Sequence, residues 1–269
     1  MISTTVHKAD KKSKLLRSLI FFAAWMFIWQ LASMLIGSEL LLPGPFIVIK
    51  ALFGLVKTSK FWLSIGCTLL RVVVGFILGM LGGIVLGIAS AKFAFVSDFL
   101  SPLRSLIKAT PVTSFIILVL LYMSASIAPM FIAFLMVLPI SWTIVQDGIE
   151  AAPRELIEAA RVLRFSRIKT IRTVYIPSVR PNLISAATTG LGFAWKSCVA
   201  AEVIAYSRLS IGRAIYESKL YLEVAELFAW TAAIVLLSIG LEKLLLLFFR
   251  KNAAKRRYPS ERSPNDDRA

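Results

Sequence analysis

The sequence is poor in the residues that build metal sites and disulfide scaffolds. Among its 269 residues it has one histidine, His7, and two cysteines, Cys67 and Cys198. Two cysteines cannot form the disulfide framework of a small secreted domain. A single histidine provides no cluster of imidazole ligands. We therefore expect no metal site and no disulfide scaffold.

Charged residues are also scarce, because they make up 17% of the chain and a typical soluble domain has about 25%. Hydrophobic residues make up 58%, and the mean hydropathy is +0.77. This composition excludes a disordered chain and an ordinary cytosolic enzyme, and it predicts an integral membrane protein. Basic residues nevertheless outnumber acidic ones by 31 to 15, so the net charge is +16.

Long uncharged runs predict the membrane spans, since a helix needs about 20 apolar residues to cross a bilayer core. Residues 109–146 carry no charge over 38 positions. One helix of that length would measure about 57 Å, nearly twice the thickness of the core. We expect this run to turn back at residues 124–129, where small residues precede Pro129. Six spans result: 18–38, 72–91, two within 109–146, 182–206 and 228–249.

The basic residues predict the orientation of these spans. The segments that six spans would leave in the cytoplasm hold 22 Lys and Arg residues, and the external segments hold 6. This asymmetry places both termini in the cytoplasm. The expected protein is a multi-pass, all-α membrane protein. It has a basic N-terminus (1–17), a six-helix membrane domain (18–249) and a basic C-terminal tail (250–269). The basic residues are concentrated in every second loop. This distribution indicates the orientation of a chain in contact with membrane lipid, and not nucleic-acid binding.

Glycines recur every four residues in the second predicted span. They occupy positions Gly75, Gly79, Gly83 and Gly87. This spacing puts them on one face of a helix. Small residues on such a face let a second helix approach closely inside a membrane. The span is therefore predicted to lie in the middle of a helical bundle.

A polar segment over residues 147–181 separates the fourth and fifth predicted spans. Pro153 and Glu155 suit the first turn of a helix. Leu156, Ala160 and Leu163 then recur at helical spacing, which predicts a short amphipathic helix. We expect Ser166 to cap a second helical piece that ends at Pro177. Such a helix could bind a soluble partner or rest on lipid headgroups.

This segment resembles a known family. Glu158-Ala159-Ala160, Leu163 and the later Val174-Tyr-Ile-Pro177 are similar to the EAA loop of binding-protein-dependent ABC transporter permeases. The resemblance extends over residues 60–250, through Thr68-Leu-Leu-Arg-Val72 with the glycine face, Ser101-Pro-Leu103, and Gly190-Leu-Gly-Phe-Ala-Trp195. The combination is similar to the branch of nitrate, sulfonate and taurine permeases and some vitamin-precursor permeases, so it leaves the substrate open.

The resemblance implies a fold, partners and a role for the loop. The fold would be that of a type I ABC importer permease in a prokaryotic plasma membrane, working as a homodimer in which a second copy of the chain takes part. Its partners would be two cytoplasmic ABC ATPase subunits and an extracytoplasmic solute-binding protein. Glu158, Ala159, Ala160, Leu163, Arg164 and Pro177 would couple the chain to the ATPases. Arg164 stands where the family has a glycine that helps form the turn after the coupling helix, which predicts a helical or shifted turn here.

The chain is expected to be no enzyme and to bind no cofactor of its own. A phosphate-binding loop needs the pattern G-x-x-x-x-G-K-[ST]. The nearest match is Gly190 to Ser197, in which Trp195 replaces the last glycine and would block a close approach of the backbone to phosphate. ATP would therefore be bound and hydrolysed by a separate subunit.

Two ionisable residues lie inside the fifth predicted span, Lys196 and Glu202. A charge near the bilayer centre costs at least about 2.5–3.5 kcal/mol on insertion scales, so each should face protein or water. Both are candidates for the translocation path, where Lys196 would suit an anionic substrate. Alternatively, Glu202 pairs with a loop cation, and Lys196 faces a buried carbonyl group or a neighbouring subunit. Six residues of helix separate them by about 240° of rotation, so they should not share a face.

The alternative function is an ion-gradient-driven secondary transporter or channel without an ATPase. Such proteins are expected to have interrupted spans and more acidic or histidine residues at the membrane centre. Those residues are scarce in this sequence. The permease subunit of an ABC importer is therefore the interpretation that the sequence favours.

Overall fold

The computed structural model describes residues 3–254, with side chains described for residues 16–249. Residues 1–2 and 255–269, which include most of the predicted basic tail, lie outside the described residues. Within 3–254 every regular element is helical, in agreement with the predicted all-α class. The helices are α1 (Ser3–Ile36), α2 (Pro45–Val56), α3 (Ser59–Lys92), α4 (Ala94–Ala109), α5 (Val112–Leu120), α6 (Ala128–Glu150), α7 (Arg154–Val162), α8 (Arg167–Thr170), the π-helix η1 (Ile171–Tyr175), α9 (Ile176–Ala205), α10 (Ile211–Leu220) and α11 (Val224–Ala254).

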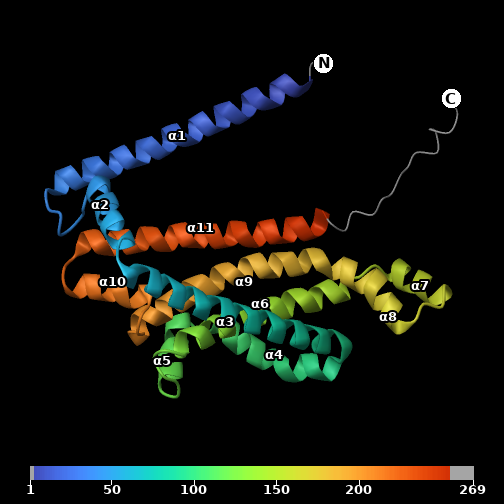
Figure 1. Cartoon of the computed structure of the whole chain (residues 1–269). Helices are drawn as coiled ribbons and strands as arrows, with labels where there is room; N and C mark the ends of the chain where they lie inside the picture. The colour runs from blue at the N-terminus through green and yellow to red at the C-terminus, as the bar shows by residue number, and fades with distance from the viewer. Residues whose placement is uncertain (1–2, 255–269) are drawn as a thin grey trace.

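Three long helices, α3, α6 and α9, form the centre of the bundle. The most extensive contacts between elements are those of α6 with α3 and with α9. Helices α7 and α8 lie at one end of this bundle, and α2 and α10 lie at the other (Figure 1). We call the end with α2 and α10 the outer end, following the orientation that the basic residues predict. A residue near α7 is thus separated from α10 by the full length of the membrane helices.

The glycine face of α3 is the surface that packs on α6. Gly75, Gly79, Gly83 and Gly87 are all buried. A Cβ atom at Gly83 would lie 2.7 Å from the Leu138 carbonyl oxygen, and one at Gly87 would lie 2.8 Å from that of Trp142. Separations this short exclude a side chain, so the two backbones touch along the whole face. The hydroxyl of Ser141 also donates to the Gly79 carbonyl oxygen at 3.0 Å.

Helices α1 and α11 lie outside this centre. Helix α11 packs against α2, α10 and α9, whereas α1 diverges from the bundle and touches it near α2 (Figure 1). No residue of the most apolar window of α1, within Leu16–Ile36, is buried. The exposed apolar side chains of α1 therefore suit lipid or another membrane chain.

Within the described part of the chain, four helices are long and apolar enough to cross a membrane: Leu16–Ile36, Ser59–Lys92, Ala128–Glu150 and Val224–Phe249. The pair α4 and α5 together would count as a fifth crossing, bent by 103°. Helix α9 has 30 residues but carries Lys196 and many small or polar residues, and it is not among the four. An integral membrane fold is thus confirmed, while the exact count of six crossings stays a prediction.

The uncharged run of residues 109–146 differs in part from its prediction. Helix α6 begins at Ala128 with Pro129 in its first turn, which confirms the predicted corner. The first half, however, forms only the nine-residue helix α5, about 14 Å long and too short to cross alone. Pro111 explains the break, because the residue before a proline avoids the helical region and Thr110 is extended at φ −79° and ψ 130°.

The predicted stop at Pro177 is wrong. Ser166 does cap α8, since its side chain accepts a hydrogen bond from the Lys169 backbone, but the chain then continues through η1 into α9 without a break. A proline lacks the N–H group that an α-helix would use. The π-turn that precedes Pro177 accommodates this loss, with the Ile176 N–H group bonded to the Ile171 carbonyl oxygen.

We predict that Gly83→Ala destabilises the bundle by about 1–3 kcal/mol, because the added methyl group overpacks the contact between α3 and α6. Gly66→Ala is the matched control on the same helix, since nothing lies within 4 Å of a Cβ atom there. Thermal unfolding of the detergent-purified chains would measure both effects. Equal unfolding temperatures for the two variants would contradict the close packing of the glycine face of α3 on α6.

Candidate functional site

Helix α7 is the amphipathic helix that the sequence predicted. Pro153 lies at its N-cap position and Glu155 lies in its first turn, where a carboxylate is favourable next to the positive end of the helix dipole. Helix α7 makes few contacts with other helices of the described chain. Together with α8 it projects from the end of the bundle opposite α10 (Figure 1).

The exposed surface of α7 is partly apolar. Leu156, Val162 and Leu163 are 50%, 81% and 64% exposed, whereas Ala160 is buried. Glu158 and Ala159 are exposed. A short projecting helix with several exposed large apolar side chains has the character of a protein-binding surface. Glu158, Ala159 and Leu163 are therefore accessible to a partner, whereas Ala160 packs inside the segment.

Arg164 keeps the turn that a glycine would form, so the prediction of a helical or shifted turn is wrong. Its φ of +51° places it in the left-handed region. The next residue, Phe165, donates its backbone N–H group to the Ala160 carbonyl oxygen at 2.9 Å. This arrangement ends the helix as a glycine C-cap does. The backbone hydrogen bonds therefore determine the turn, at the conformational cost of a left-handed arginine.

Lys196 lies on a face of α9 that no other described helix covers. Ser185, Thr189, Phe193, Lys196 and Ala200 are all exposed at helical spacing, while the opposite face, which includes Ala187, Gly190 and Ala194, is buried. Phe193 is 51% exposed. A lysine so placed in a membrane helix needs water or another protein beside it. Gly190 and Trp195, from the near match to a phosphate loop, lie in the middle of the same helix.

Glu202 lies on the other side of α9 and is fully buried. Its carboxylate accepts hydrogen bonds from the Thr68 hydroxyl at 2.9 Å, from Arg71 at 2.8 Å and from the Gly212 backbone at 3.3 Å. The Thr68 hydroxyl also accepts from the backbone of Ile211 at 3.1 Å. These contacts join α3, α9 and the first turn of α10.

Arg71 extends this cluster to two loops. Its guanidinium donates to the carbonyl oxygen of Ser126 at 3.1 Å and to that of Arg208 at 3.0 Å. The Arg71 side chain is only 13% exposed. Glu202 therefore pairs with a cation from α3 and not, as the alternative prediction had it, with a loop cation. The carboxylate of Glu202 lies inside the protomer. The sequence patterns did not single out Arg71 or Thr68 for this role, although an arginine at the edge of an apolar span already signals that an acceptor is needed nearby.

Arg71→Ala is expected to destabilise the chain by about 3–5 kcal/mol, because it leaves a buried carboxylate without its cation. Lys60→Ala is the control, since its ion pair with Glu217 involves a side chain that is 66% exposed and should contribute below about 1 kcal/mol. Adding Glu202→Gln to Arg71→Ala should recover part of the loss in thermal unfolding. A loss no larger than that of Lys60→Ala would contradict this role of Arg71.

Comparison with known proteins places the chain in a family. Residues 83–257 match the family described as binding-protein-dependent transport system inner membrane component. A probable ABC transporter permease of Brucella melitensis is 27% identical over 85% of this chain and 92% of its own length. The nitrate import permease of Synechococcus elongatus is 27% identical over 73% of this chain and 74% of its own. The taurine transport permease of Escherichia coli is 25% identical over 80% of each chain.

Solved structures show the same fold. A bacterial ABC transporter involved in the import of the acidic polysaccharide alginate contains a chain that matches 94% of this one and 99% of its own length, with a TM-score of 0.60 and 16% identity. An amino acid ABC transporter matches 70% of this chain and 94% of its own, with a TM-score of 0.53 and 20% identity.

The family match covers well over half of the chain and includes α6, α7 and the face of α9 that carries Lys196. It supports the importer and not the alternative of an ion-gradient-driven transporter or channel. The chain therefore belongs to the inner-membrane components of binding-protein-dependent transport systems and is a permease subunit of a prokaryotic ABC importer.

Proposed function

We propose that α7 is the segment through which a separate cytoplasmic ATPase drives this permease. The observation that carries the proposal is the projecting, partly apolar surface of α7, on which Leu156, Val162 and Leu163 are at least half exposed. Glu158 and Ala159 lie on the accessible part of the same helix. ATP would be bound by that partner subunit, and this chain would contribute no cofactor site of its own.

The connections of α7 explain how movement at this surface would reach the membrane. Helix α6 ends at Glu150, directly before α7, and α9 continues from α8 and η1 directly after it. Helices α6 and α9 also pack extensively against each other. A displacement of α7 is therefore applied to two packed central helices together. Because α3 is joined closely to α6, the displacement would move the bundle as a unit.

The uncovered face of α9 suits the translocation path. We propose that a second copy of the chain, or a related permease subunit, faces this side of the bundle across the path. Lys196 would then lie in contact with water and substrate instead of lipid, which removes the cost of exposing a charge to the bilayer. The buried position of Glu202 favours a structural role for that residue. Of the two candidates for the translocation path, Lys196 therefore remains.

The substrate would reach this path from an extracytoplasmic solute-binding protein at the outer end. Two relatives are named for the import of nitrate and taurine, both of which carry an anionic oxygen group. Lys196 has the complementary charge. We propose that the imported solute is small and carries such a group.

Glu158→Lys and Leu163→Asp are expected to reduce co-purification of the ATPase subunit about ten-fold or more, as losses at the centre of a protein interface commonly do. Both side chains are exposed, so the variants should fold. The measurement is the amount of ATPase recovered with the tagged chain in mild detergent, together with ATP-dependent uptake in cells.

The matched controls for these variants lie at the outer end. Glu223→Lys repeats the charge reversal, and Leu220→Asp repeats the apolar-to-acidic change on α10; both residues are exposed. We expect neither control to change ATPase recovery. Normal recovery with the α7 variants, or transport that persists after ATP depletion, would refute the coupling role.

Lys196→Met is expected to lower uptake of an anionic solute about ten-fold or more, because a charge-assisted contact is lost. ATPase recovery should stay unchanged, and Lys196→Arg should retain more uptake than Lys196→Met. Lys243→Met serves as the control, since it removes an exposed charge from α11. Equal uptake by the Lys196 and Lys243 variants would exclude Lys196 from the path.

A further inference from the structure

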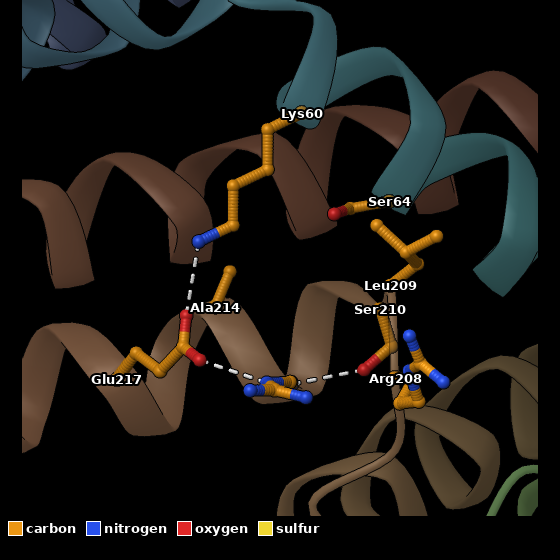
Figure 2. Close-up of a pocket in the computed structure, with 8 residues that line it drawn as sticks. Lys60, Ser64, Arg208, Leu209, Ser210, Ala214 and Glu217 are labelled. Carbon is orange, nitrogen blue, oxygen red and sulfur yellow. Dashed lines mark hydrogen bonds and ion pairs between the residues drawn. The ribbon is translucent and has the colours of Figure 1, made fainter.

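A pocket of about 290 Å³ lies at the outer end of the bundle, between the start of α3 and helix α10 (Figure 2). This volume is close to the lower limit for pockets that hold small molecules. The pocket is far from α7 and is not built from the face of α9 that carries Lys196. It is lined by Lys60, Ser64, Arg208, Leu209, Ser210, Arg213, Ala214 and Glu217.

Three cations and one carboxylate line this outer pocket. Glu217 accepts from Lys60 at 3.0 Å and from Arg213 at 2.7 Å. Partial burial by itself would raise the pKa of the Glu217 carboxyl, but hydrogen bonds from Arg213, Lys60 and Tyr206 outweigh it and lower the pKa to about 2. Glu217 therefore stays ionised at physiological pH, and the pocket retains an excess of positive charge.

Arg208 carries much of this excess. Its side chain lies on the side of the pocket opposite Glu217, and no hydrogen bond joins its guanidinium to another lining residue (Figure 2). Its backbone is fixed, because the Arg208 carbonyl oxygen accepts from Arg71 at 3.0 Å. The exposed guanidinium of Arg208 thus starts from a fixed point of the backbone and offers a fork of donors that can bind a carboxylate or an oxoanion.

Ser64 adds a hydroxyl group to the lining of the outer pocket. The residue is 1% exposed, yet its hydroxyl points into the space between Lys60 and Leu209 and bonds to none of the other lining residues (Figure 2). A hydroxyl group with this orientation can donate a hydrogen bond to an anionic oxygen in the pocket.

The beginning of α10 does not need an added anion. The N–H groups of Ile211, Gly212 and Arg213 already donate to Thr68, Glu202 and Ser210. The attraction for an anion in the outer pocket therefore comes from the side chains of Arg208, Arg213 and Lys60 and not from an open helix end.

We propose that the outer pocket is a binding site for a small carboxylate or oxoanion, such as a sulfate or sulfonate group, held by Arg208 and Arg213 with Ser64 as a hydrogen-bond donor. The site is distinct from the coupling surface and from Lys196, so it does not depend on the proposed function. It would concentrate anions at the outer end of the bundle. The same oxygen chemistry is offered by a free anion and by the phosphate of a lipid headgroup.

Sulfate is the probe for the test. We expect it to raise the unfolding temperature of the full-length, detergent-purified chain in a saturable way when it replaces chloride at constant ionic strength. Arg208→Gln should raise the half-saturating sulfate concentration about ten-fold, the loss expected for a charge-assisted hydrogen bond. Ser64→Ala should raise it about three-fold.

Lys219→Gln is the matched control, because it removes the same formal charge from an exposed position on α10 outside the pocket. It should change the half-saturating concentration less than two-fold. Unsaturable stabilisation, or equal effects of Arg208→Gln and Lys219→Gln, would overturn the proposal.

Nanodiscs distinguish the two sources of the anion. If phosphatidylglycerol weakens sulfate binding to the unmodified chain but not to Arg208→Gln, relative to phosphatidylcholine, the pocket binds lipid phosphate. If sulfate binding is the same in both lipids and still depends on Arg208, the pocket binds a free anion. Either result supports an anion site. Binding that does not depend on Arg208 in either lipid would refute it.

Discussion

The contact of α3 with α6 is the constraint on which the rest of the structure depends. In a bilayer there is no hydrophobic drive that brings two apolar helices together, so association relies on close packing and hydrogen bonds. The buried glycine face of α3 supplies the packing, and Ser141 supplies a hydrogen bond to the Gly79 carbonyl oxygen. With α3 and α6 fixed as a pair, α9 packs on α6 and the loops at both ends are held in place.

The two ends of this bundle are built for different purposes. Towards the outer end, Glu202 and Arg71 compensate each other's charge and tie α10 and two loops to the central helices. At the other end, α7 is held by few contacts and presents exposed apolar side chains. One end is therefore stabilised by its own polar contacts, whereas the other is suited to a partner that would cover it.

Much of the architecture could be predicted from the sequence because membrane helices follow simple local rules. Uncharged runs, the corner at Pro129 and the amphipathic pattern of α7 depend on hydrophobicity and backbone geometry. The predictions that were wrong involved local hydrogen bonds of the backbone, which residue types alone do not specify. Arg164 stays in a glycine-like turn because backbone hydrogen bonds hold it there, and Pro177 does not stop the helix because a π-turn accommodates it.

By itself, the sequence determined that the chain is an all-helical membrane protein with a glycine face and a short amphipathic helix, and its motifs showed a resemblance to ABC importer permeases. The helices and their faces depend on periodicity and composition, which are local, and the resemblance depends on short motifs. The tertiary structure alone decided that α6 is the partner of the glycine face and that Glu202 is paired with Arg71, 131 residues away. It also showed that Lys196 lies on an uncovered face. Burial and charge pairing depend on which distant segments meet, and spacing along the chain does not specify that.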